Sequence, residues 1–241
     1  MTSPDDSAFT LRGVPQLTVV DLADPRLDDA TRRAGLTALE QVHQRHFPEY
    51  PHMVTEFEQW LAEGWPDPDI VIHLWLARDA RGPCGVFVLH TNTRRGVVLA
   101  HYVAVDNRTR ATLPRGWLTS LIEAMADIGS ADCRRRGTEL LAIMLEVPQE
   151  HVHKWTRVGG EQLDVGYGEP LGGRFRAAGE PEFRWLCPII FTTAAGRASA
   201  PETVAGAALR SFLLDYYQLN PDNETVAAML ADATPGVSPE H

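Results

Sequence analysis

The stretch GVVLAHYVAVDNRTRATLPRGW, from Gly96 to Trp117, is the centre of the predicted fold. Apolar residues occupy both alternating faces of its first half, which is typical of a strand in the middle of a sheet. The polar pair Asp106 and Asn107 ends this strand. Arginines then surround the expected start of a helix, at Arg108, Arg110 and Arg115. Helix-start N–H groups with nearby guanidinium groups favour a bound phosphate. The alternative is an ordinary strand-to-helix turn with solvated arginines.

The composition is that of a globular protein with an acidic surface. The 241 residues are 44% hydrophobic, which is enough for a full core, and the formal net charge is -10. This charge argues against a nucleic-acid partner and mildly favours an amine-bearing ligand. The N-terminus does not read as a signal peptide, and no apolar run is long enough to span a bilayer. We therefore expect a cytoplasmic protein with no membrane partner.

No metal site or disulfide is predicted. The cysteines Cys84, Cys133 and Cys187 are odd in number and form no Cys-x-x-Cys pair. The histidines are better explained as solvated or helix-end residues than as metal ligands, because a metal site needs converging ligands with supporting carboxylates.

Periodicity and turn signals predict the order of the remaining elements. Before the central stretch we expect a strand at 17–22, a helix from the start signal Asp24-Pro25 to Phe47, a helix ending at Gly64, and antiparallel strands at 70–77 and 85–90. After it we expect a helix at 114–136, a strand at 139–148 parallel to the central strand, a short helix at 149–158, a strand at 162–167, a loop at 168–181 and a strand at 183–193. A linker then leads to helices at 201–217 and 221–231, the second capped by Asn220, and to a disordered tail.

This order resembles that of the Gcn5-related N-acetyltransferase (GNAT) superfamily over about residues 16–193. YVAVD (102–106) is similar to the family's cofactor strand, and RRRG (134–137) to the end of its next helix. WTRVGG (155–160) resembles the family's FYxRxGA segment. LEVP (145–148) and DVGYGEPLGG (164–173) look more specifically like a poorly characterised bacterial branch.

The resemblance implies an α/β fold with a mixed, mostly antiparallel central sheet flanked by helices. Residues 1–196 would form this GNAT-like domain, and residues 197–241 a C-terminal helical extension with the tail. It also implies acetyl-CoA, or another acyl-CoA, as the cofactor of an N-acyltransferase that acts on a primary amine of a small molecule or peptide. Backbone groups of Val103, Ala104 and Val105 would pair with the pantetheine arm.

The phosphate loop departs from the family pattern Arg/Gln-x-x-Gly-x-Gly/Ala. Arg110 matches the first position, but Leu113 and Arg115 stand where small residues belong, and a Cβ there obstructs close approach of the backbone to a phosphate. Gly116 could substitute if the loop carries an insertion. Either the side chains of Arg108, Arg110 and Arg115 compensate, or CoA is held poorly or not at all.

Acyl transfer to an amine needs a base, and Glu146 is the first candidate. It ends an apolar run at the carboxyl end of the 139–148 strand, where desolvation would raise its pKa. The alternative is a strand-end glutamate that points to water or caps the next helix. Trp155 replaces the tyrosine by which many family members protonate the thiolate, and an indole cannot supply an acidic proton. Tyr102 could supply it, or could be a core tyrosine.

The acceptor pocket would be lined by Glu49, Tyr50, His101 and Tyr167. His101 is expected to face opposite Tyr102, so only one of the two could readily enter the cleft. Two other functions stay open: a catalytically silent GNAT-like protein that binds a ligand or partner, and an acyltransferase that uses a carrier-protein thioester. The C-terminal helices would either pack on the core or form a homodimer contact through Leu209, Phe212, Leu213 and Tyr216.

Overall fold

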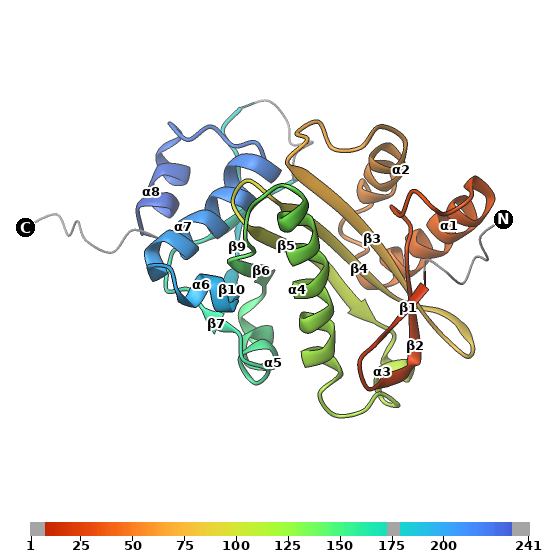
Figure 1. Cartoon of the computed structure of the whole chain (residues 1–241). Helices are drawn as coiled ribbons and strands as arrows, with labels where there is room; N and C mark the ends of the chain where they lie inside the picture. The colour runs from red at the N-terminus through yellow and green to blue at the C-terminus, as the bar shows by residue number, and fades with distance from the viewer. Residues whose placement is uncertain (1–7, 173–178, 233–241) are drawn as a thin grey trace, which may run out of the picture. The chain divides into compact units, whose positions relative to one another are not determined.

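The computed structural model describes residues 8–172 and 179–232 (Figure 1). Part of the expected 168–181 loop and the expected tail lie outside the described residues. The chain forms two compact units. The first comprises Met1–His90 and Ala100–Asp127, and the second comprises Thr91–Leu99 and Ile128–His241. None of the helices in the described ranges combines the length and apolar content needed to cross a membrane.

Eight strands are hydrogen-bonded in the order β1-β2-β3-β4-β5-β6-β10-β7, and β8 pairs separately with β9. The strands are β1 Ala8–Leu11, β2 Val14–Asp21, β3 Ile70–Asp79, β4 Gly82–Asn92, β5 Val97–Val105, β6 Ala142–Val147, β7 Glu161–Gln162, β8 Gly168–Pro170, β9 Phe183–Trp185 and β10 Cys187–Thr192. The β1–β2, β2–β3, β6–β10, β7–β10 and β8–β9 pairs are antiparallel. The predicted mixed α/β class with a mostly antiparallel sheet is confirmed.

The helices flank these strands (Figure 1). They are α1 Asp29–His46, α2 Met53–Glu63, α3 Asn107–Arg110, α4 Trp117–Arg135, the 3-10 turn η2 Gln149–His151, α5 Val152–Thr156, α6 Ala194–Arg197, α7 Pro201–Arg210, the π-helix η4 Ser211–Tyr216 and α8 Glu224–Asp232.

Two predicted helix starts were wrong by a few residues. Helix α1 is capped by Asp28, whose carboxylate accepts the N–H groups of Ala30 and Thr31. The carboxylate of Asp24 pairs instead with the guanidinium of Arg26 at 2.6 Å, and therefore does not cap the helix. In the same way, helix α8 begins after Asn223 rather than after Asn220, because the Asn223 side chain accepts the N–H of Val226.

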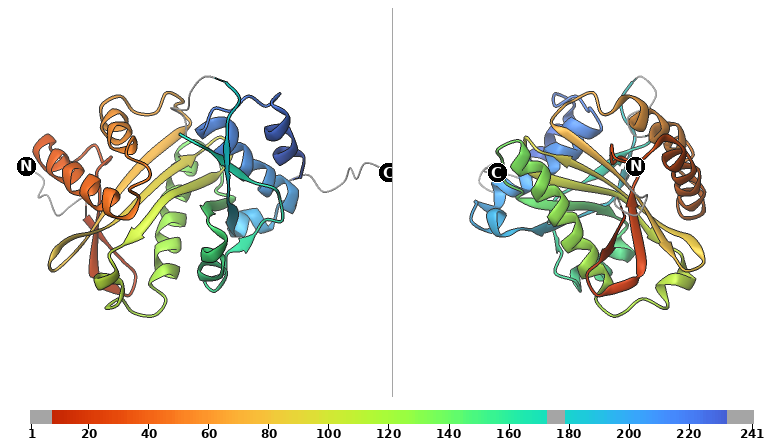
Figure 2. Two further views of the ribbon diagram at one scale, coloured as in Figure 1. Left: turned by 180° about the vertical axis from the view of Figure 1, so that it is seen from behind. Right: turned by 45° about the vertical axis from the view of Figure 1, so that its right-hand side comes forward.

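In the first unit, α1 and α2 lie side by side, and α1 also contacts β3 (Figure 2). The inward face of α2 includes Met53, Phe57 and Trp60, as its spacing predicts. Gly64 ends α2 with φ 74, a left-handed conformation that favours glycine. This unit therefore buries its helix pair in the way that the apolar pattern indicates.

In the second unit, β10 lies between β6 and β7 and pairs with β6 along its whole length, from Cys187 opposite Val147 to Thr192 opposite Ala142. Of the expected 162–167 strand, only Gln162 lies in a strand, because β7 is limited to Glu161–Gln162. The expected 183–193 strand divides at Leu186, whose N–H bonds to the carbonyl of Tyr167. The expected linker contains the short helix α6, capped by the hydroxyl of Thr193.

Close packing of α4 in this unit depends on Gly129. A Cβ at this position would lie 2.3 Å from Cγ2 of Val98 and 3.3 Å from the methyl groups of Leu140. Glycine therefore lets α4 approach the start of β5 more closely than any other residue would.

Candidate active site

The carboxylate of Glu146, near the end of β6, is the centre of the candidate site. The hydroxyl of Tyr167 donates a short hydrogen bond to Oε1 of Glu146, and the hydroxyl of Tyr217 donates to Oε2 at 2.8 Å. Glu146 is half-buried, whereas the tyrosines are only 1% and 3% exposed. The structure thus brings together two residues predicted from sequence, Glu146 and Tyr167, and adds a third.

Backbone pairing and ring packing position these side chains. Glu146 lies opposite Pro188 in the β6–β10 register. The ring of Phe212 packs against both tyrosines, with centroids 6.4 Å from Tyr167 and 6.1 Å from Tyr217. Both hydroxyl groups are therefore held by packed aromatic rings rather than by mobile surface loops.

A second carboxylate, Glu169, influences this site. It is 8% exposed and accepts a hydrogen bond from Arg184 at 2.5 Å. Burial and the negative charge of Glu169 raise the pKa of Glu146 well above its usual range, although the hydrogen bonds from Tyr167 and Tyr217 act in the opposite direction. Burial, together with the charge of Glu146, also raises the pKa of both tyrosines well above its usual range. The site therefore combines neutral hydroxyl donors with a carboxylate that holds a proton more readily than usual.

Sequence reasoning missed Tyr217 and Glu169. The only available signal for Tyr217 was the aromatic end of the expected 201–217 helix, whose residues were considered for a core or for a dimer contact. The structure supports the core alternative, because those four side chains are between 0% and 4% exposed. They are Leu209, Phe212, Leu213 and Tyr216.

The predicted residues Tyr102 and Tyr50 lie together in the first unit. The Tyr102 ring is 4.7 Å from that of His43, 5.0 Å from Phe47 and 5.4 Å from Tyr50, measured between centroids. Tyr50 is half-buried and Glu49 is exposed. Tyr102 is therefore a packed tyrosine whose neighbours come from α1 and the segment that follows it.

His101 joins the same series of ring contacts. Its ring is 4.7 Å from that of His90, which is 4.7 Å from Trp60 on α2. Trp60 contacts Phe57, and Phe57 contacts His43, the neighbour of Tyr102. A series of ring contacts through β4, α2 and α1 therefore joins His101 to Tyr102, and the expectation that only one of the two enters the cleft stays a prediction. Burial lowers the pKa of His101 to about 3, so its imidazole is neutral at neutral pH.

In β5, the strand expected to pair with a cofactor, some backbone amides point toward β4 and others point away from it. The N–H of Asp106 bonds to the carbonyl of Cys84 on β4 at 2.7 Å. Because successive amides point to opposite sides of a strand, those of Val103 and Val105 point away from β4, whereas that of Ala104 points toward it.

The arginine-rich segment differs from the expected helix start. Arg108 and Arg110 belong to the separate turn α3, and α4 begins only at Trp117. The N–H groups of residues 110–113 are bonded within this turn, so they are not available to a phosphate. Gly116 is exposed with φ 90, and nothing lies within 4 Å of a Cβ added there.

The arginine side chains are the groups in this segment that suit a phosphate. Arg108, Arg110 and Arg115 are all exposed, and no ion pair joins any of them to an acidic side chain in the described part of the chain. Arg110 donates one hydrogen bond, at 2.8 Å, to the side chain of Asn107. In this segment, guanidinium groups rather than the bonded backbone N–H groups of residues 110–113 are therefore exposed to an anion.

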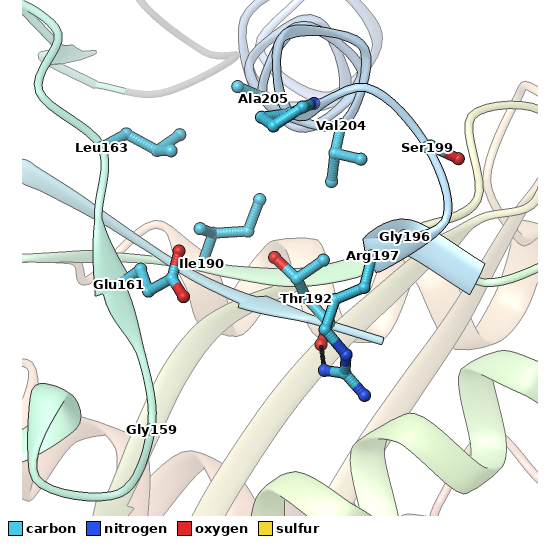
Figure 3. A pocket seen from close by; sticks show the side chains of 11 residues that line it. Gly159, Glu161, Leu163, Ile190, Thr192, Gly196, Arg197, Ser199, Val204 and Ala205 are labelled. Atoms are coloured by element: carbon cyan, nitrogen blue, oxygen red, sulfur yellow. Dashed lines mark hydrogen bonds between the residues drawn. The ribbon is translucent and has the colours of Figure 1, made fainter. Parts of the chain in front are cut away.

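A separate pocket of about 280 Å³ opens in the second unit between β7, β10 and the α6–α7 segment (Figure 3). Leu163, Ile190 and Val204 give it an apolar lining, with Glu161 on one strand and Arg197 across from it (Figure 3). The residues bonded to Glu146 do not line this pocket, so it is not part of the candidate active site.

No protein-family model and no curated protein matches this chain. Among solved structures, it is similar to spermidine N-acetyltransferase from Vibrio cholerae in complex with CoA and spermine, with 16% identity, 73% of this chain and 95% of that chain covered, and a TM-score of 0.48. It is also similar to Tetrahymena GCN5, with 12% identity, 67% and 91% covered, and a TM-score of 0.42. A tandem GNAT protein from the clavulanic acid biosynthesis pathway gives 13% identity, 64% and 46% covered, and a TM-score of 0.47. The identities are 16% or less and the TM-scores are below 0.5, so these likenesses carry no conclusion about activity.

Proposed function

We propose that this protein transfers an acyl group, acetyl in the first instance, from acyl-CoA to a primary amine of a small molecule or peptide. The observation that carries the proposal is the half-buried Glu146 carboxylate, held by Tyr167 and Tyr217 and shifted toward holding a proton. A carboxylate with a raised pKa accepts a proton more readily than an ordinary carboxylate, and amine acylation requires a proton acceptor.

Glu146 takes the role of general base in this proposal. As the amine nitrogen bonds to the thioester carbonyl carbon and the carbon–sulfur bond breaks, Glu146 accepts the proton that leaves the nitrogen, directly or through a water molecule. Each carboxylate oxygen has two lone pairs, so the bonds from Tyr167 and Tyr217 leave acceptor sites for this proton. Tyr102 or solvent would supply the proton that the thiol leaving group needs.

The first unit would hold the cofactor, which supplies the acyl group as an activated thioester. The outward amides of Val103 and Val105 would pair with the pantetheine arm in the manner of a strand. Arg108, Arg110 and Arg115 would bind the pyrophosphate. Glu49, Tyr50 and His101 would line the acceptor pocket, where aromatic faces and a carboxylate suit an ammonium group before it loses its proton.

Calorimetric titration with acetyl-CoA and with free CoA tests the cofactor part of the proposal. Micromolar binding is the expected result. Arg110→Ala should weaken CoA more than it weakens acetyl-pantetheine, which lacks the phosphates, and equal losses would exclude phosphate binding by this arginine. No binding at millimolar CoA would overturn the proposal in favour of the carrier-protein alternative, which the internally bonded amides of residues 110–113 suit better.

Thiol release with a panel of primary amines tests the chemical step. Glu146→Gln should lower turnover by about 10²–10⁴-fold, the usual contribution of a general base, and leave CoA binding nearly unchanged. Glu139→Gln is the matched control, because Glu139 is an exposed carboxylate in the same unit. Unchanged turnover in Glu146→Gln would remove this residue from the mechanism.

A further inference from the structure

Tyr217 directly follows a π-helix that is held from two sides. After α7 ends at Arg210, residues Ser211–Tyr216 widen into the π-helix η4, and the N–H of Tyr217 bonds to the carbonyl of Phe212 at 2.8 Å. The next residue, Gln218, has φ 52, a left-handed conformation that is uncommon outside glycine. Single π turns inside helices occur frequently at functional sites.

Asp215 anchors this segment to the turn before β5. Its side chain is 9% exposed and accepts hydrogen bonds from Nδ2 of Asn92 at 2.7 Å, Nη2 of Arg94 at 3.2 Å, and Nε and Nη2 of Arg95. Arg95 is fixed in turn, because its N–H bonds to Oδ1 of Asn92 at 3.1 Å. An aspartate paired with two guanidinium groups and a buried amide is a rigid attachment point.

Tyr217 caps η4 with helical backbone angles, φ -76 and ψ -11. Asp215 and Tyr217 are two positions apart, so they are separated by roughly 160–200° around the helical axis and point to opposite sides of it. One side of η4 is therefore tied to residues 92–95, and the other side presents the Tyr217 hydroxyl to Glu146. We propose that Asp215 is a positioning residue that keeps the Tyr217 hydroxyl on Glu146, and so links the turn before β5 to the proposed base. The role of this link in catalysis rests on the proposed function. The positioning of the Tyr217 hydroxyl by Asp215 does not.

The link has a measurable consequence in the titration of Glu146. Within residues 8–172 and 179–232, the titratable groups that act on this carboxylate are Tyr167, Tyr217 and Glu169. The hydrogen bond from Tyr217 lowers the pKa of Glu146 relative to the same site without it. If Asp215 holds Tyr217 in place, its removal should raise the pKa of Glu146 in the same way that removal of the Tyr217 hydroxyl does.

The experiment is a ¹³C NMR titration of glutamate carboxyl groups in the full-length protein, with the Glu146 signal assigned from Glu146→Gln. We expect Tyr217→Phe and Asp215→Ala to move the Glu146 titration to higher pH by about one pH unit each, the effect of one lost hydrogen bond to a charged group. The double variant should show no further shift. Asp222→Asn, at an exposed aspartate of the same unit, should leave the titration unchanged.

A titration at the wild-type position in folded Asp215→Ala would overturn the inference, as would additive shifts in the double variant. If Asp215→Ala does not fold, Asp215→Asn and Arg95→Gln weaken the same attachment and should give smaller shifts of the same sign. The acid limb of the pH–rate profile should move with the NMR titration in each variant. If no acyl transfer is found while the NMR shifts occur, the proposed function fails and the positioning role stands.

Discussion

His43 allows a quantitative test of how burial in the first unit makes the stability of the fold depend on pH. Its imidazole is fully buried, and neither ring nitrogen hydrogen-bonds to any residue within 8–172 or 179–232. Burial lowers the pKa of His43 from 6.5 to about 4. Between these values the unfolded chain takes up a proton that the folded chain does not, so the fold loses stability as the pH falls. This difference in pKa corresponds to about 3 kcal/mol of unfolding free energy, which is lost as the pH drops from above 6.5 to below 4.

His43→Phe removes this titration and keeps a ring against Phe57 and Tyr102. Urea unfolding followed by circular dichroism between about pH 4 and pH 8 should show that the wild type loses about 3 kcal/mol more than the variant over this range. The control is His153→Asn, which removes an exposed imidazole and should follow the wild type. Parallel pH curves for the wild type and His43→Phe would refute the reasoning, whatever the absolute stability of the variant.

Three further substitutions test the packing and charge of the second unit. Because the pKa of Glu146 is raised in the folded protein, the wild type loses stability as the pH rises above about 4.5. Glu146→Gln lacks this titration, so its unfolding free energy in urea should rise relative to that of the wild type by up to about 1.4 kcal/mol per pH unit. For the control Glu139→Gln, the difference in unfolding free energy from the wild type should not depend on pH. The same result for Glu146→Gln would contradict the prediction. Gly129→Ala should lower the unfolding free energy by about 1–3 kcal/mol, since its Cβ would lie 2.3 Å from Val98. Gly206→Ala in α7 should raise it by about 0.5–1 kcal/mol, because the new Cβ meets only the flexible end of one arginine. If thermal unfolding showed that Gly129→Ala and Gly206→Ala change the stability in the same direction, the clash at Gly129 would not determine the effect of the substitution.

The parts of the fold that sequence predicted well are those governed by local pattern. The both-sided apolar run of β5 predicted an interior strand, and β5 lies between β4 and β6 in the strand order. The apolar stripe of α2 and Gly64 at its end likewise predict the helix and its buried face, because helix burial follows a 3.6-residue period. Glu146 was chosen because it follows a buried run, and Tyr167 by resemblance.

The parts that sequence did not predict depend on contacts between distant residues. The bond from Tyr217 to Glu146 joins residues 71 apart in the chain. A regular helix was expected at 201–217, and the periodicity of that segment does not reveal that it widens into a π-helix. The turn α3 was missed for a related reason, since four residues are too few to show a helical period.

The strands at the ends of the main sheet bear on how the protein avoids aggregation. Exposed strand edges are templates on which another chain can add a strand. Here β1 has four residues and β7 only two, so each end offers few backbone groups for such pairing. Next to β7, Pro188 gives β10 a position without an N–H donor. The missing N–H group of Pro188 and the short length of β7 therefore both disfavour strand addition, and hence fibril formation, at this edge.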